Sequence, residues 1–148
     1  MCLMLYIGSH EGLTEQETPD LRIEPVEQAR LSVVRWFTQP VVQFVGAHTG
    51  CSCGFPTVVS EDVVEYYDGM WANSDERAGD LRSVSALIQL LHGALGASGP
   101  IELYPVWDGN EGKAPKGAVE WSLERLSPET FVFTEQFMYV LRGVDEAA

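Results

Sequence analysis

The spacing of apolar residues predicts one long amphipathic helix over about residues 75–95. Residues on a single helical face recur there in the order Leu81, Val84, Ile88, Leu91 and Leu95. Asn73 or Ser74 can cap the N-terminus of this helix, because a short polar side chain accepts hydrogen bonds from the first free backbone N–H groups. Glycines and Pro100 follow the last apolar position and end the helix.

Shorter runs of apolar, β-branched and aromatic residues predict β-strands in the rest of the chain. These runs cover residues 2–8, 21–25, 41–45, 101–107, 118–123, 131–133 and 137–141. Pro105 predicts that its run forms an edge strand or contains a bulge, because proline has no N–H to give to a strand ladder. Residues 26–37 fit a short helix better than a strand, and residues 61–72 fit a short helix or a packed loop.

Together these elements predict a single α+β domain over residues 1–148. We expect a mostly antiparallel β-sheet packed against the one long helix, since the crossover helices of a doubly wound fold are largely missing. A chain of 148 residues fits one domain with one core. The hydrophobic fraction of 45% is typical of globular proteins, so a core can form.

The chain is strongly acidic, which narrows the choice of partners. Nine basic and 22 acidic residues give a net charge of −13 at pH 7. This charge repels phosphate backbones and anionic lipids, so we expect no nucleic acid and no membrane as partner, whereas a basic protein remains compatible. No apolar run reaches the roughly 20 residues that span a bilayer. Three cysteines without an export segment predict a reducing, cytoplasmic location.

His48, Cys51 and Cys53 form the candidate functional site. They follow the predicted strand 41–45 in the spacing His-x2-Cys-x-Cys. Glycines at positions 46, 50 and 54 allow positive φ angles, which a tight loop with inward-facing side chains often needs. In the simplest interpretation the loop is only a strand exit, with small buried cysteines and a locally hydrogen-bonded histidine. Two functional interpretations stand beside it.

The first functional interpretation is a metal site. His48, Cys51 and Cys53 supply imidazole and thiolate ligands, which suit zinc or copper. Tetrahedral zinc needs a fourth ligand, and the candidates are His10, His92, Cys2 and Glu135. The paired Cys-x2-Cys motif that marks many structural zinc sites is absent from the sequence.

The second functional interpretation is thiol chemistry. Cys51 or Cys53 would act as a catalytic nucleophile or redox group, with His48 as base or as the group that lowers the thiol pKa. The other thiol would then resolve a sulfenic acid or close a disulfide. Neither the Cys-x2-Cys redox motif nor the Cys-x5-Arg loop of thiol phosphatases is present.

Other features give weaker signals. A phosphate-binding glycine loop is missing, so no nucleotide cofactor is expected. Glu135 is expected to lie in a turn and to face solvent. The four tryptophans are expected to contribute to the core rather than to a binding pocket.

Two functions of different classes therefore remain open. The favoured one is a small acidic binding, interaction or structural domain without catalysis. The alternative is a thiol- or metal-dependent site at His48, Cys51 and Cys53, redox or hydrolytic in action. Unreactive, buried thiols would support the first, and fast thiol modification or one bound metal ion per chain would support the second.

Overall fold

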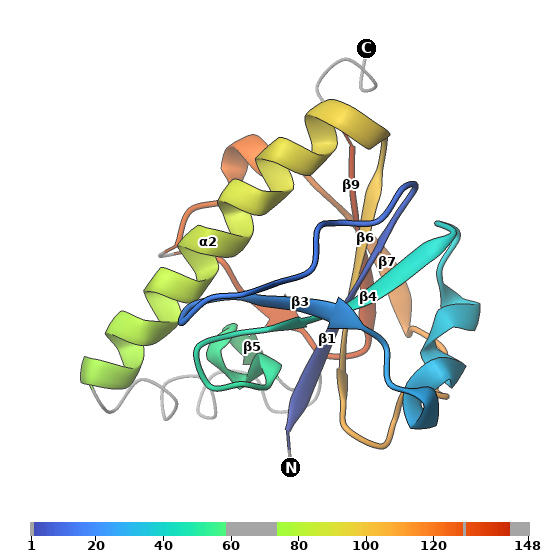
Figure 1. Cartoon of the computed structure of the whole chain (residues 1–148), viewed down its shortest axis with the longest axis horizontal. Helices are drawn as coiled ribbons and strands as arrows, with labels where there is room; N and C mark the ends of the chain where they lie inside the picture. Colours follow the sequence, from blue (N-terminus) through green and yellow to red (C-terminus); the bar gives the residue numbers. More distant parts are fainter. Residues whose placement is uncertain (1, 59–73, 129, 143–148) are drawn as a thin grey trace.

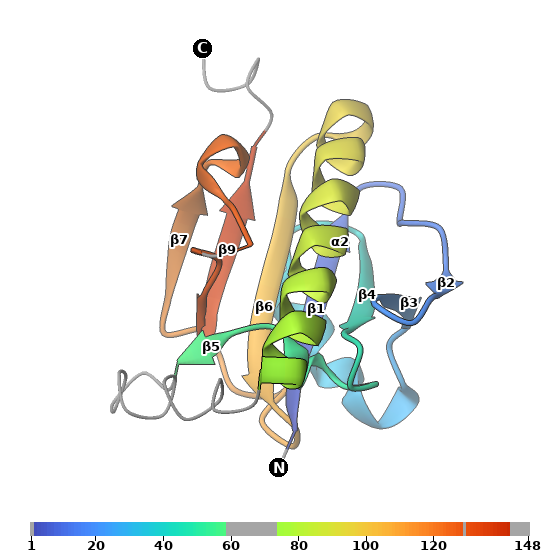
Figure 2. The same cartoon turned by 90° about the vertical axis from the view of Figure 1, so that its left-hand side faces the viewer.

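The protein folds as a seven-stranded sheet with one long helix, α2 (Ser74–Ser98), lying across one face (Figures 1 and 2). The structure is a computed structural model, and it describes residues 2–58, 74–128 and 130–142. The helix predicted at about residues 75–95 is confirmed, and the prediction for residues 61–72 lies outside the described residues. Within the described ranges, no helix is both long enough and apolar enough to cross a membrane.

The strand order of the large sheet places the N-terminal strand near its centre. The sheet runs β2 (Gln16–Glu17), β3 (Arg22–Pro25), β4 (Val41–Gly46), β1 (Leu3–Ser9), β6 (Ile101–Trp107), β9 (Phe137–Leu141) and β7 (Gly117–Trp121). Neighbouring strands are antiparallel, except that β7 and β9 are parallel. A short parallel ladder joins β5 (Thr57–Val58) and β8 (Phe133–Thr134). The mostly antiparallel α+β fold is thus confirmed.

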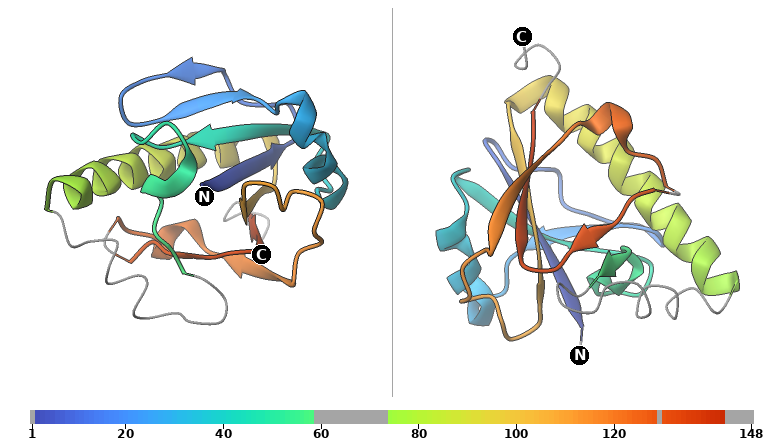
Figure 3. Two further views of the ribbon diagram at one scale, coloured as in Figure 1. Left: turned by 90° about the horizontal axis from the view of Figure 1, so that it is seen from below. Right: turned by 180° about the vertical axis from the view of Figure 1, so that it is seen from behind.

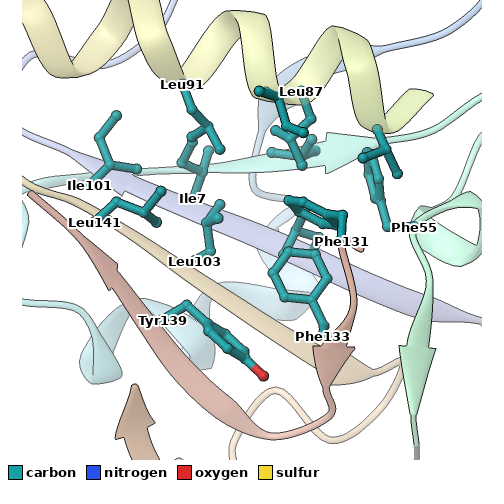
Figure 4. Packing of buried hydrophobic residues seen from close by; sticks show 14 of the residues in the cluster. Ile7, Phe55, Leu87, Leu91, Ile101, Leu103, Phe131, Phe133, Tyr139 and Leu141 are labelled. Carbon is teal, nitrogen blue, oxygen red and sulfur yellow. The ribbon is translucent and has the colours of Figure 1, made fainter. Parts of the chain in front are cut away.

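The main core lies between α2 and the sheet (Figure 4). Leu87 and Leu91 point from the helix toward Ile7 of β1 and Leu103 of β6, and all four side chains are fully buried. Burying one such side chain contributes roughly 1.5–3 kcal/mol. Val84, Ile88 and Leu91 of the predicted apolar stripe belong to this core, so the stripe lies on the face of the helix that covers the sheet.

A second apolar cluster fills the opposite face of the sheet. Side chains alternate between faces along a strand, so Tyr6 points away from α2 while its neighbour Ile7 points toward it. A 3₁₀ helix, η1 (Gln28–Trp36), covers this face with the buried Val33. The short helix expected within residues 26–37 is thus present, in 3₁₀ form.

Pro105 marks neither a sheet edge nor a bulge in the ladder with β1, so that prediction is wrong. Its strand, β6, lies between β1 and β9 in the interior of the sheet, and its register with β1 is continuous. The ladder between β6 and β9 covers only Ile101 to Leu103 on β6. Pro105 lies beyond the end of that ladder, where no partner strand needs its missing N–H. Its carbonyl accepts a hydrogen bond of 2.7 Å from the backbone N–H of Gln136.

Candidate functional site

The three cysteines of the chain meet where β1 begins. Cys2 directly precedes β1, and Cys51 and Cys53 belong to the turn that contains the short 3₁₀ helix η2 (Ser52–Gly54). This turn lies beside the N-terminal end of β1 (Figure 3, left). The three Sγ atoms all lie within 4.8 Å of one another, and no other three His, Cys, Asp or Glu ligands of the described residues come as close.

The turn takes the place of β4 beside the first residues of β1. The pairing of β4 with β1 ends at Val45 and Leu5. There the buried hydroxyl of Ser52 accepts a hydrogen bond from the Leu5 N–H at 2.7 Å and donates one to the Val45 carbonyl at 2.6 Å. Further along the strand, the Leu3 N–H donates to the Sγ of Cys53 at 3.2 Å. The backbone of β1 therefore fixes the segment that carries both thiols.

A tight backbone loop holds Cys51 from the other side. The Ala47 N–H donates to the Cys51 carbonyl at 2.8 Å, and the Gly50 N–H donates to the Ala47 carbonyl at 3.0 Å. Gly50 has a φ of 87°, in the left-handed region that favours glycine. Gly46 and Gly54 do not have a positive φ, so of the three glycines only Gly50 uses that freedom.

The three thiols differ in their tendency to ionise. Burial raises the pKa of Cys53 to about 12, and the neighbouring sulfur of Cys51 adds to the rise. Burial acts in the same direction on Cys51, but hydrogen bonds from Cys53, Thr49 and Cys2 outweigh it and lower the pKa. The pKa of Cys2 is raised, because its thiol hydrogen-bonds to Cys51 and feels the charge there. Cys51 is therefore the first of the three to become a thiolate.

His48 has a different partner from the one that the sequence predicts. Its Nε2 lies 2.7 Å from the Oδ1 of Asp80 on α2, and its backbone N–H donates to the Ser83 hydroxyl at 3.0 Å. The ring lies between two glycines: a Cβ at Gly79 would come within 2.7 Å of it, and one at Gly54 within 2.9 Å. The ligand group of three cysteines does not include His48. The imidazole thus ties the loop to the helix, and Cys2 takes the third place beside Cys51 and Cys53.

The other ligand candidates lie elsewhere. His10 and His92 are exposed, and neither belongs to the thiol cluster. Glu135 lies in a turn, as expected, but it is buried and not solvent-facing. Its Oε1 lies 3.5 Å from the Nζ of Lys116, which compensates part of its charge. The fourth candidate, Cys2, does join the cluster.

A pocket of about 280 Å³ opens beside the thiol cluster. Cys2 and Cys51 line it, whereas Cys53 does not. Met4, on the same face of β1 as Cys2, continues the wall, and Arg22 also lines the pocket. Two of the three cysteines therefore line a space that a small molecule can enter.

Several residues that position the site carry no signal in the sequence. Ser52 is one hydroxyl among many, and Asp80 is an acidic residue in an acidic chain. Arg22 holds the loop by donating from Nη1 to the Gly50 carbonyl at 3.4 Å.

Comparison of this chain with protein-family models, with curated proteins and with solved structures finds no match. The function is therefore argued from the thiol cluster and its surroundings.

Proposed function

We propose that this protein binds one thiophilic metal ion, zinc or copper(I), through Cys2, Cys51 and Cys53. The observation that carries the proposal is the convergence of every cysteine of the chain on one point. Cys2 directly precedes β1, whereas Cys51 and Cys53 lie in the turn that follows β4 in the sequence. Proximity in sequence therefore does not explain why the three cysteines lie together. Such binding requires no catalysis and agrees with the favoured class of a binding domain.

The spacing of the sulfur atoms suits a shared metal ion. Two thiolates bound to one zinc at about 2.3 Å lie about 3.8 Å apart in a tetrahedral site. The three Sγ atoms lie within 4.8 Å of one another, so displacements of about 0.5 Å per atom would bring them to such positions. Thiolate sulfur selects zinc and copper(I) among biological metals, and three sulfur ligands satisfy the coordination of either ion in part or in full.

Outer contacts support the same ligand set. The Leu3 N–H donates to the Sγ of Cys53, and the Thr49 hydroxyl lies 3.7 Å from the Sγ of Cys51. Hydrogen bonds to ligating sulfur atoms hold the ligands in place and tune the metal. The net charge of −13 also favours a cation over an anion.

Metal titration of the reduced, metal-free protein tests the proposal. Addition of Zn²⁺, or of Cu⁺ under anaerobic conditions, is expected to saturate at one ion per chain, measured by elemental analysis after desalting. Replacement of any one cysteine by serine should weaken binding by more than the roughly 10–100-fold that loss of an outer-shell partner costs.

His48→Gln is the matched comparison, because the amide can still donate to Asp80. We expect this variant to keep its metal affinity, whereas Cys2→Ser loses it. If Cys2→Ser binds as tightly as wild type while His48→Gln does not, the ligand set of His48, Cys51 and Cys53 is correct instead. If none of the proteins binds a metal ion, the proposal is wrong.

A basic protein partner, suggested by the acidic composition, stays a prediction. Binding to such a partner would weaken steeply as salt rises, because charge attraction between surfaces is screened.

A further inference from the structure

The pocket beside the thiol cluster holds a charged group with unused donor capacity. Arg22 lines the pocket and makes one short ion pair, from Nη2 to Glu24 at 2.9 Å. Its Nε is buried and has no hydrogen-bond partner among the described residues, with Glu17 3.9 Å away. A buried donor without a partner is costly, so a small shift of the Arg22 side chain that brings its guanidinium to an acceptor in the pocket would be favoured.

The second arginine of the pocket already pairs with three carboxylates of the protein. Arg30 pairs with Glu27, with Asp108 at 2.7 Å and with Glu111 at 3.3 Å. Arg22 is therefore the residue of the pocket whose guanidinium can donate hydrogen bonds to the carboxylate of a ligand. It is also the arginine next to the thiols, since its Nη1 contacts the Gly50 carbonyl directly before Cys51.

Three carboxylates also line the pocket wall. Glu24, Glu27 and Asp108 all contribute to it, and the last two are partly exposed. These three carboxylates outnumber the two arginines that they pair with, Arg22 and Arg30, so the wall keeps a net negative charge that favours an ammonium group on the ligand. The volume of about 280 Å³ lies at the lower end for small-molecule sites and suits a molecule of amino-acid size.

From this arrangement we propose that Cys51 exchanges with small disulfides of the amino-acid type, such as cystine, whose carboxylate binds Arg22. This activity goes beyond metal binding and does not depend on it. The substrate would be held with its carboxylate on Arg22, its ammonium group toward the acidic wall and its disulfide at Cys51.

The reaction balances within the cluster. The Cys51 sulfur attacks one sulfur of the small disulfide, the S–S bond breaks, and the departing half leaves as a thiolate that takes up a proton. Cys2, which also lines the pocket, then attacks the Cys51 sulfur and displaces the second half as a thiol. Two protein thiols are oxidised to the Cys2–Cys51 disulfide, and the small disulfide is reduced to two thiols. Cys53 is outside the pocket and takes no part.

Three small disulfides separate the roles of the charges. Cystine carries both ammonium and carboxylate groups, cystamine lacks the carboxylates, and dithiodipropionate lacks the ammonium groups. Reduced, metal-free protein is mixed with each compound, and intact-mass spectrometry follows the mixed disulfide and the internal disulfide with time. Cys2→Ser should stop at the mixed disulfide, and Cys51→Ser should form neither product at the wild-type rate.

Arg22→Gln is the decisive variant. We expect it to react with cystine roughly tenfold more slowly than wild type, as the loss of one charge-assisted hydrogen bond implies, but with cystamine at the wild-type rate. Arg82→Gln is the control, because Arg82 is exposed and pairs with Asp20 outside the pocket. The unchanged rate with cystamine also shows that the loop is intact in Arg22→Gln.

Three results would overturn the proposal. They are an equal slowing of Arg22→Gln with cystine and cystamine, a Cys51→Ser variant as fast as wild type, and absence of exchange with cystine in the wild-type protein. Each is independent of whether the protein binds zinc or copper, so metal binding and disulfide exchange can fail separately.

Discussion

The imidazole of His48 donates from Nε2 to the Oδ1 of Asp80 at 2.7 Å, and this hydrogen bond joins the thiol-bearing loop to the long helix. Asp80 is only 5% exposed, so its carboxylate depends on protein donors rather than on water. The close approach of the ring to α2 requires Gly79, since a Cβ there would lie 2.7 Å from the Cε1 of His48. The geometry of the cysteine turn is thus set partly by a helix that contributes no thiol.

Asp80→Asn tests this link. The amide keeps the shape of the carboxylate but replaces a charged acceptor, so the free energy of unfolding should fall by about 1–3 kcal/mol in urea titrations. Asp20→Asn, on a partly exposed residue, should change it by less than about 0.5 kcal/mol. Equal effects of the two substitutions would contradict a structural role for the His48–Asp80 bond.

Ser52 is expected to be the most sensitive hydroxyl of the site. Ser52→Ala removes both the acceptor for the Leu5 N–H and the donor to the Val45 carbonyl, and leaves these two buried backbone groups unpaired. We expect the free energy of unfolding, measured in urea, to fall by at most about 1–3 kcal/mol for each unpaired group. Ser122→Ala, at an exposed position, is the control and should be nearly neutral. A neutral Ser52→Ala would show that water replaces the hydroxyl.

The pH dependence of alkylation should distinguish the thiols. The lowered pKa of Cys51 gives it more thiolate at a given pH, so its rate with iodoacetamide should rise at lower pH than that of an ordinary cysteine. Cys53, with a pKa of about 12 and partial burial, should react slowest. Peptide mapping after short labelling pulses measures each site, and Cys51→Ser should remove the fast phase. A fast phase on Cys53 would contradict the assignment.

Alkaline pH should destabilise the protein through Tyr6. Burial and the hydrogen bond from its hydroxyl to Glu111 at 2.8 Å raise its pKa far above the ordinary value of about 10. The unfolded chain therefore loses this proton at lower pH than the folded chain does. The stabilisation that protonated Tyr6 contributes is complete below about pH 10 and is lost as pH rises above it. Above about pH 10, the free energy of unfolding should fall more steeply with pH for wild type than for Tyr6→Phe. Parallel slopes would contradict the prediction.

The sequence predicted the elements well because their signals are local. The helix α2 follows from the spacing of its apolar face, and the strands follow from short β-branched and aromatic runs. The two-residue strands β2 and β5 were not predicted, and the other errors concern placement: Pro105 lies inside the sheet, and Glu135 is buried in its turn. The positions of Pro105 and Glu135 depend on the order of the strands in the sheet and on where each ladder ends. The preferences of single residues do not carry that information.

For the candidate site too, the sequence identifies some residues and only the tertiary structure identifies the others. Cys51 and Cys53 could be singled out from the chain, because two thiols among glycines after a strand are unusual at any position. Their actual neighbour Cys2, and the turn of His48 toward Asp80, follow only from the packed sheet. The Leu3 N–H reaches the Sγ of Cys53 across 50 positions of sequence because β1 lies beside the end of β4. Local patterns define strands and turns, but the order of strands brings distant side chains together, and only the folded chain has that order.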